Sequence, residues 1–221
     1  MKRILIVAAV LMLISMSPVQ KTKIVFFGDS ITQAGVKKGG YNDRIQTWVI
    51  QKSLQDKYEL VGAGIGGNKV YDLYLRVEDD VMAKDPQVVV IYVGINDVWH
   101  KTTTGTGTDL NKYEKFYIAL IKKFQAKNIK VAVCTPTVIG EKKDDTNPQD
   151  KDLNAYSDIV RKLAAEYKCT LVDLRKAFSV YEQANNADNK ESGLLTTDRV
   201  HLTDAGNQLV ADEMVKALSL Q

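Results

Sequence analysis

Short apolar runs alternate along the chain with stretches that are apolar at every third or fourth position. The runs are rich in Val, Ile and Leu and lie at residues 23–27, 59–61, 87–93, 130–134 and 170–174. Runs that are apolar at every position are typical of strands covered on both faces. Helical spacing follows at residues 70–81, 110–124 and 153–164, and a last helix is predicted at 204–218 with Thr203 as its N-cap.

This alternation predicts one α/β domain, in which a mostly parallel five-stranded sheet lies between two layers of helices. Two polar stretches, residues 102–108 and 140–152, follow predicted strands at their carboxyl ends. Ligands of open parallel sheets bind at these ends. We expect either stretch to be a solvated connector rather than a substrate lid.

The first residues have the pattern of an export signal. Lys2 and Arg3 precede an apolar run over residues 4–14, and small residues follow, with Ser15 and Ser17 at the −3 and −1 positions of a cut after residue 17. The run is shorter than the roughly 20 apolar residues of a spanning helix. We therefore predict a secretory signal at 1–17, a single domain at 18–221 and a periplasmic or extracellular location. A buried first strand or an uncleaved anchor is the alternative, and no stable membrane anchor is expected.

Composition narrows the range of partners. The 221 residues include 30 Lys and Arg against 27 Asp and Glu, a net charge of +3, and two of the basic residues lie in the predicted signal. No run of basic residues is interleaved with aromatic ones, so nucleic acid is not an expected partner. The chain has two His, no HExxH motif and no clustered Cys. We therefore expect neither a metal nor another cofactor.

The first strand ends in Gly28, Asp29 and Ser30. A serine at a glycine-marked turn into a helix is well placed to be an exposed nucleophile, although this is not the GxSxG elbow. Ser30 could equally be the N-cap of the following helix.

The second strand runs into a glycine-rich segment. Gly62, Gly64 and Gly67 satisfy GxGxxG, a dinucleotide fingerprint that also needs an acidic residue at the end of the next strand. The candidates Asp79 and Asp80 fall in a helical stretch instead. The alternative is that the backbone N–H of Gly64 stabilises an oxyanion.

Two further strand ends carry polar side chains. Asn96 follows the third strand, where its amide could be another oxyanion donor or could cap a turn. Asp198 lies three residues before His201, just ahead of the last predicted helix. In a turn, such a carboxylate can hold the imidazole as a neutral acceptor, the form that activates a serine. A coincidental Asp and His pair at this spacing is the alternative.

In this order, the segments Gly28-Asp29-Ser30, Gly64, Gly94-Ile95-Asn96-Asp97 and Asp198-Arg199-Val200-His201 resemble the four blocks of the SGNH, or GDSL, hydrolase superfamily. The resemblance spans most of the chain and implies a flavodoxin-like three-layer α/β/α hydrolase of esters. It implies Ser30 as nucleophile, His201 as general base and Asp198 as its orienting partner. The implied oxyanion hole consists of Ser30, Gly64 and Asn96, with Asp29 and Asp97 as supporting residues.

Three positions qualify the resemblance. The second block often carries Asn where this chain has Gly62, so the loop around Gly64 is expected to be supported differently. Arg76 lies where many relatives have an Arg, and we expect it to form a surface ion pair. His100 lacks an orienting carboxylate at triad spacing, so it is expected at the rim of the site or on the surface.

The residues together predict an exported serine esterase that hydrolyses short-chain acyl esters through an acyl-enzyme on Ser30. O-acetyl groups on carbohydrate are the favoured substrate, as a small molecule or a polysaccharide. A lysophospholipase or thioesterase with the same residues is the alternative, and a non-enzymatic glycan or dinucleotide binder is less favoured. The sequence does not indicate the oligomeric state.

Overall fold

The computed structural model describes residues 21–221, so the predicted signal at 1–17 lies outside the described residues. Five strands form one sheet in the order β2-β1-β3-β4-β5, and every neighbouring pair is parallel. The strands are β1 (Thr22–Gly28), β2 (Tyr58–Gly64), β3 (Val88–Tyr92), β4 (Lys130–Cys134) and β5 (Thr170–Val172). The predicted α/β class is confirmed.

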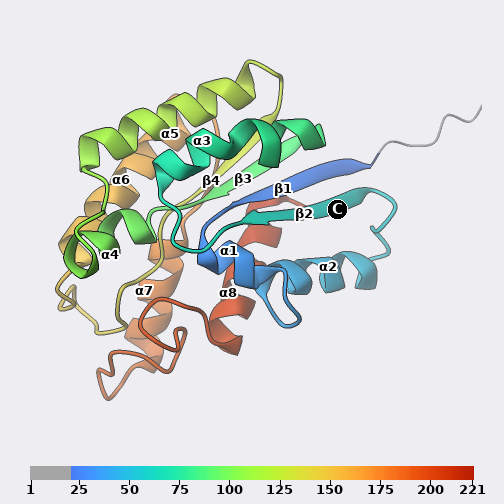
Figure 1. Ribbon diagram of the computed structural model, residues 1–221. Helices are drawn as coiled ribbons and strands as arrows, with labels where there is room; N and C mark the ends of the chain where they lie inside the picture. The colour runs from blue at the N-terminus through green and yellow to red at the C-terminus, as the bar shows by residue number, and fades with distance from the viewer. Residues whose placement is uncertain (1–20) are drawn as a thin grey trace, which may run out of the picture.

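Helices cover both faces of the sheet, which gives three layers (Figure 1). One layer contains α3 (Val70–Asp80), α5 (Leu110–Gln125) and α6 (Asp150–Glu166), with the short helix η1 (Met82–Lys84) after α3. The other contains α1 (Ser30–Gly35), α2 (Tyr41–Gln51), α7 (Leu174–Asn185) and α8 (Asp204–Leu218). The remaining helix, α4 (Ile95–Thr103), follows β3 and contacts α6.

The strands are apolar because both of their faces are covered. Val25, Phe26 and Phe27 in the middle of β1 have no exposed surface, and neither does Ile91 in β3. The register pairs Gly28 of β1 with both Gly64 of β2 and Tyr92 of β3. The segments that leave these three strands therefore begin side by side at one edge of the sheet.

The last helix begins and ends where the sequence predicts. Thr203 is its N-cap, and the Thr203 hydroxyl oxygen accepts a hydrogen bond of 3.1 Å from the backbone N–H of Gly206. The elements predicted from the sequence do not include α2, α4 and α7. In α2 the apolar stripe is narrow, and in α7 the buried positions include the charged residues Arg175 and Glu182 while Val180 is exposed.

The fifth strand is shorter than predicted because a cap ends it. Asp173 follows β5, and its side chain accepts a hydrogen bond from the backbone N–H of Lys176, so the chain turns into α7 at Leu174. Among residues 21–221, no helix is both long and apolar enough to cross a membrane.

Candidate active site

Ser30 lies at the junction of β1 and α1. The N-cap of α1 is Asp29, whose carboxylate accepts a hydrogen bond of 3.0 Å from the backbone N–H of Ile31. The alternative that Ser30 caps this helix is therefore wrong, and its hydroxyl is free for another partner. Gly28 before it leaves no room for a side chain, because an added Cβ would lie 2.3 Å from the Thr32 hydroxyl oxygen.

That other partner is His201. Ser30 Oγ lies 3.0 Å from His201 Nε2, although 171 residues separate the two in sequence. On the other side of the ring, His201 Nδ1 lies 2.7 Å from Asp198 Oδ2. Because an ionised carboxylate only accepts, Nδ1 carries the proton and Nε2 is left to accept the proton of the serine hydroxyl.

A tight turn holds the Asp198 carboxylate towards the ring. Its Oδ1 accepts hydrogen bonds from the backbone N–H groups of Val200, at 3.1 Å, and of His201, at 2.8 Å. Arg199 within the turn has a φ of 79°, in the left-handed region. Partial burial alone would raise the pKa of Asp198, but the hydrogen bonds from the His201 ring and from the two N–H groups outweigh it and lower the pKa below its usual value.

The predicted oxyanion donors come from the neighbouring strand ends. Gly64 is the last residue of β2 and packs directly on α1, since an added Cβ would lie 2.2 Å from the backbone nitrogen of Gln33. The loop then passes Ser30, because an added Cβ on Gly66 would come within 4.0 Å of the Cβ of Ser30. Asn96 lies in the first turn of α4, is buried, and donates from Nδ2 to the Asn68 carbonyl oxygen at 3.0 Å.

The two supporting residues act on the backbone. Asp97 is fully buried, and its carboxylate accepts from the backbone N–H of Val70 at 3.2 Å, which ties the start of α4 to the start of α3. Burial raises the pKa of Asp97 and also that of Asp29, each to about 7. Neither carboxylate has a hydrogen bond to Ser30 or His201 among the side-chain contacts of the described residues.

The dinucleotide alternative finds no support in this geometry. Asp79 and Asp80 lie in α3 rather than at the end of a strand. Gly62 lies inside β2 with Val36 against it, since an added Cβ would lie 2.2 Å from Val36 Cγ1. An Asn at position 62 would therefore need Val36 to move.

Arg76 forms the expected ion pair, with Asp80 at 2.6 Å, but it does not lie on the surface. Its side chain is 14% exposed and contacts Asn68, Asp80 and two backbone carbonyl oxygens as well as the ring of Phe27. The sequence signal that could have found it is its position in α3, on the side of the helix that faces the β1 and β2 ends.

Two aromatic residues of α4 border the site. The Trp99 ring lies edge-on to the His201 ring, with 6.3 Å between the centroids, and 5.9 Å from the ring of His100. His100 faces the loop at Gly67, as the predicted position at the rim requires. Partial burial and the nearby charge of Lys69 lower the pKa of His100 below its ordinary value. Trp99 was not among the predicted site residues.

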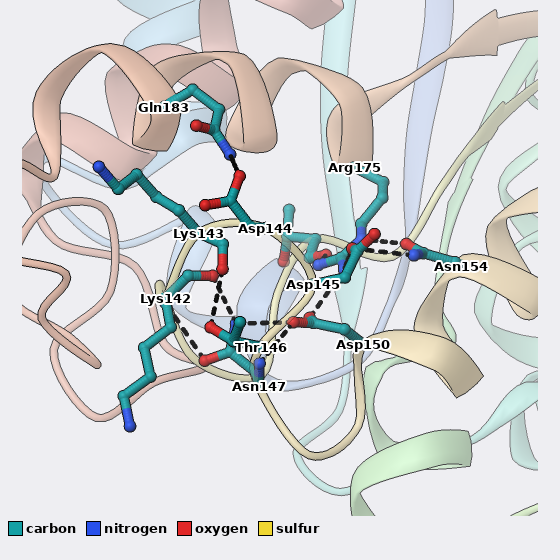
Figure 2. A network of polar contacts seen from close by, with 11 residues as sticks. Lys142, Lys143, Asp144, Asp145, Thr146, Asn147, Asp150, Asn154, Arg175 and Gln183 are labelled. Atoms are coloured by element: carbon teal, nitrogen blue, oxygen red, sulfur yellow. Dashed lines mark hydrogen bonds and ion pairs between the residues drawn. The ribbon is translucent and has the colours of Figure 1, made fainter.

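The segment 140–152 is not a solvated connector. Gly140, Glu141, Asn147 and Asp150 are buried, and Figure 2 shows Asn147 and Asp150 in one polar network with Arg175. Arg175 donates to Asp150 Oδ1 at 2.8 Å. The other predicted connector, residues 102–108, begins inside α4 and then carries exposed residues.

Glu141 links this segment to the one that carries His201. Its carboxylate accepts hydrogen bonds from the backbone N–H groups of Leu194, at 2.9 Å, and Leu195, at 2.8 Å, and from both the backbone and the hydroxyl of Thr196. The Gly140 N–H also donates to the Arg199 carbonyl oxygen at 2.8 Å. No motif surrounds this fully buried Glu after β4, so its role could not be predicted from the sequence.

The parallel α/β/α sheet with Ser30, His201 and Asp198 in hydrogen-bonded series at its edge defines the class of serine hydrolases with a Ser-His-Asp arrangement. Within that class, the chain belongs to the GDSL-like lipase/acylhydrolase family, whose family model matches residues 26–209. The predicted superfamily is thereby confirmed, and the protein is a carboxylic ester hydrolase.

Known relatives agree with this family. The crystal structure of an acetyl xylan esterase, AlAXEase, is similar over 89% of this chain and 99% of that one, with 60% sequence identity and a TM-score of 0.88. The acetylxylan esterase of Geobacillus stearothermophilus is 28% identical over 220 residues, which cover 90% of this chain and 94% of that protein. An uncharacterised lipoprotein of Bacillus subtilis (strain 168) is 25% identical over 220 residues and 90% of each chain.

Proposed function

We propose that the protein removes O-acetyl groups from xylan or xylo-oligosaccharides by serine catalysis. The substrate assignment is supported by the similarity to an acetyl xylan esterase, with 60% identity over 99% of that chain. The chemistry is supported by the hydrogen-bonded series of Ser30, His201 and Asp198. A lysophospholipase or thioesterase is not favoured by these comparisons.

Acylation begins with proton transfer. His201 Nε2 takes the proton of Ser30 while Ser30 Oγ forms a bond to the acetyl carbonyl carbon, whose oxygen becomes negative. The 3.0 Å separation of the two atoms is within the range for such a transfer. Asp198 stabilises the imidazolium that forms and remains ionised, as its lowered pKa favours.

The negative oxygen accepts hydrogen bonds from the N–H groups of Ser30 and Gly64 and from Asn96 Nδ2. Only one hydrogen of the Asn96 amide is used by Asn68, so the second is available. When the carbonyl reforms, the bond to the sugar oxygen breaks and that oxygen takes the proton from His201. Water then attacks the acyl-enzyme with the same base, releasing acetate and restoring the Ser30 hydroxyl.

The test is release of acetate from acetylated xylo-oligosaccharides by the wild type and by Ser30→Ala. We expect the variant to keep only the residual rate that binding and the oxyanion hole supply. Ser179→Ala is the matched control, because Ser179 is an exposed serine on α7. Unchanged turnover in Ser30→Ala would refute the proposed mechanism.

Substrate class is decided separately with p-nitrophenyl esters of increasing chain length. Acetyl xylan esterase activity predicts the highest kcat/KM for the acetyl ester. A preference for acyl chains of eight or more carbons would instead support the lysophospholipase or thioesterase alternative.

The proposal also places the enzyme outside the cytoplasm, as the pattern of Lys2, Arg3 and the apolar run at 4–14 suggests. Cell fractionation followed by N-terminal sequencing tests this. We expect mature protein beginning at Pro18 in the periplasm or the medium, and full-length protein confined to the cytoplasm would contradict export.

A further inference from the structure

Arg76 of α3 joins the ends of two strands to the loop that follows them. Its Nη2 donates to the carbonyl oxygens of Gly28, at 2.7 Å, and Ala63, at 3.1 Å. Its Nε donates to Asn68 Oδ1 at 2.7 Å, and its Nη1 to Asp80 Oδ2 at 2.6 Å. One guanidinium group therefore makes four hydrogen bonds at the edge of the sheet that carries Ser30.

The bond to Ala63 fixes an oxyanion donor. The Ala63 carbonyl belongs to the same peptide group as the N–H of Gly64. That group is planar and trans, so its C=O and N–H point in opposite directions. A guanidinium that holds the carbonyl oxygen therefore also sets the direction of the Gly64 N–H.

The bond to Asn68 fixes a second donor. The Asn68 side chain is held by Arg76 Nε, and the Asn68 backbone carbonyl oxygen accepts from Asn96 Nδ2 at 3.0 Å. Asn68 is only half-buried and follows the exposed residues at 65–67, and its backbone N–H donates to the Ile65 carbonyl oxygen at 3.3 Å. The orientation of the Asn96 amide thus depends on Arg76 through one residue.

We propose that Arg76 is a positioning residue that aligns the Gly64 N–H and the Asn96 amide towards the oxyanion. The proposal rests on the proposed serine mechanism and adds a residue that does not itself touch substrate. Because Arg76 acts on both donors, its loss should reduce stabilisation of the transition state while leaving ground-state binding of the ester nearly unchanged.

The geometry requires arginine rather than a positive charge alone. The planar guanidinium directs donors to three sides at once, whereas a lysine ammonium is a single point that cannot reach all four acceptors. The Asp80 carboxylate partly neutralises the charge, and the guanidinium carbon lies over the Phe27 ring, 4.5 Å from its centroid. Arg76→Lys therefore keeps the charge and removes the geometry.

The experiment compares Arg76→Lys with the wild type on p-nitrophenyl acetate. We expect kcat to fall by about 10- to 1000-fold, the range for displacing an oxyanion donor, and KM to stay within about twofold. Arg161→Lys is the matched control, because the Arg161 guanidinium donates to Asp158 within α6 and to Asp173, the N-cap of α7. Urea unfolding confirms that each variant is folded under the assay conditions.

A double-mutant cycle separates positioning from general structural damage. Asn96→Ala removes one of the two donors that Arg76 aligns, so Arg76→Lys should cost less in this background than in the wild type, and the part that acts through the Gly64 N–H should remain. If Arg76→Lys does not fold, Asn68→Ala replaces it in the cycle, since this change removes the acceptor of Arg76 Nε from a half-exposed position.

An unchanged kcat, a change confined to KM, or losses that simply add in the double variant would each overturn the proposal. p-Nitrophenyl acetate reports ester hydrolysis whatever alcohol the natural ester contains. The experiment therefore decides the role of Arg76 even if acetylated xylo-oligosaccharides prove not to be the substrate.

Discussion

Replacement of Glu141 by Ala should destabilise the fold and lower catalysis together. The buried carboxylate accepts from the backbone N–H groups of Leu194, Leu195 and Thr196 and from the Thr196 hydroxyl. Its removal leaves three backbone donors without a partner, each of which costs about 1 to 3 kcal/mol where water cannot reach it. Leu194 is partly exposed, so water compensates part of its loss.

We therefore expect the free energy of unfolding to fall by about 3 to 5 kcal/mol, a large share of the roughly 5 to 15 kcal/mol of a typical domain. For a chain of this size, 3 kcal/mol corresponds to a decrease in Tm of about 6 to 12 °C. Urea unfolding followed by circular dichroism gives the first value and a thermal scan the second.

A graded series makes the test sharper. Glu141→Gln keeps one oxygen, which can still accept from Leu195 and Thr196, and loses chiefly the bond from Leu194. It should therefore destabilise the fold less than Glu141→Ala. Glu191→Gln is the control, because Glu191 is exposed and its carboxylate forms an ion pair with Lys142 at 2.6 Å. If Glu141→Ala unfolded at the wild-type urea concentration, the assigned role of this carboxylate would be refuted.

Three other predictions concern the edge of the sheet. Gly64→Ala should lower kcat by about 100- to 1000-fold, because the added Cβ meets the backbone of α1. Gly66→Ala should cost far less, since the added Cβ lies 3.1 Å from the end of the Gln33 side chain and 4.0 Å from the Cβ of Ser30, an ordinary contact distance. The Trp99 ring lies beside His201, where it can contact the sugar of the substrate. Trp99→Ala should therefore raise KM for acetylated xylo-oligosaccharides by about 5- to 30-fold, the equivalent of about 1 to 2 kcal/mol of lost contact between ring and sugar. An equal change for p-nitrophenyl acetate, which has no sugar, would contradict this role. Burial raises the pKa of Asp29 to about 7, so the stability that its protonated form contributes is complete below about pH 4 and is lost as the pH rises through 7. The urea midpoint of the wild type should therefore fall between pH 5 and pH 8, and Asp29→Asn should make this fall smaller. A fall of the same size in the variant would contradict the assignment.

The residues that could be predicted from the sequence are those whose chemistry is marked by local pattern. Ser30 follows a strand and a glycine, and Asp198 and His201 share one turn, so spacing alone brings each near a strand end. The parallel register then aligns Gly28, Gly64 and Tyr92, which is a consequence of the strand pattern. The structure supplies what spacing could not, the 3.0 Å contact between Ser30 and His201.

The residues that could not be predicted act through long-range backbone contacts. Glu141 is 53 to 55 residues from the N–H groups that it accepts from, and Arg76 is 48 residues from the Gly28 carbonyl oxygen. Any charged side chain in a polar or amphipathic segment has the same pattern whether it is solvated or buried. Only the packing of the loops distinguishes the two, so both residues were expected on the surface or left unassigned.

His201 is accessible to solvent, which explains why buried hydrogen bonds must hold the backbone that carries it. The side chains of His201 and Asp198 are 39% and 51% exposed, and a hydrogen bond between two solvent-exposed side chains competes with water and restrains their geometry only weakly. Yet a displacement of about 1 Å can cost about 100-fold in rate. The position of the His201 ring must therefore be set by the backbone that carries it, and that backbone is held by the Glu141 carboxylate and by the bond from Gly140 N–H to the Arg199 carbonyl oxygen. Loss of Glu141 should accordingly lower kcat in molecules that remain fully folded, which a purely global effect on stability would not do.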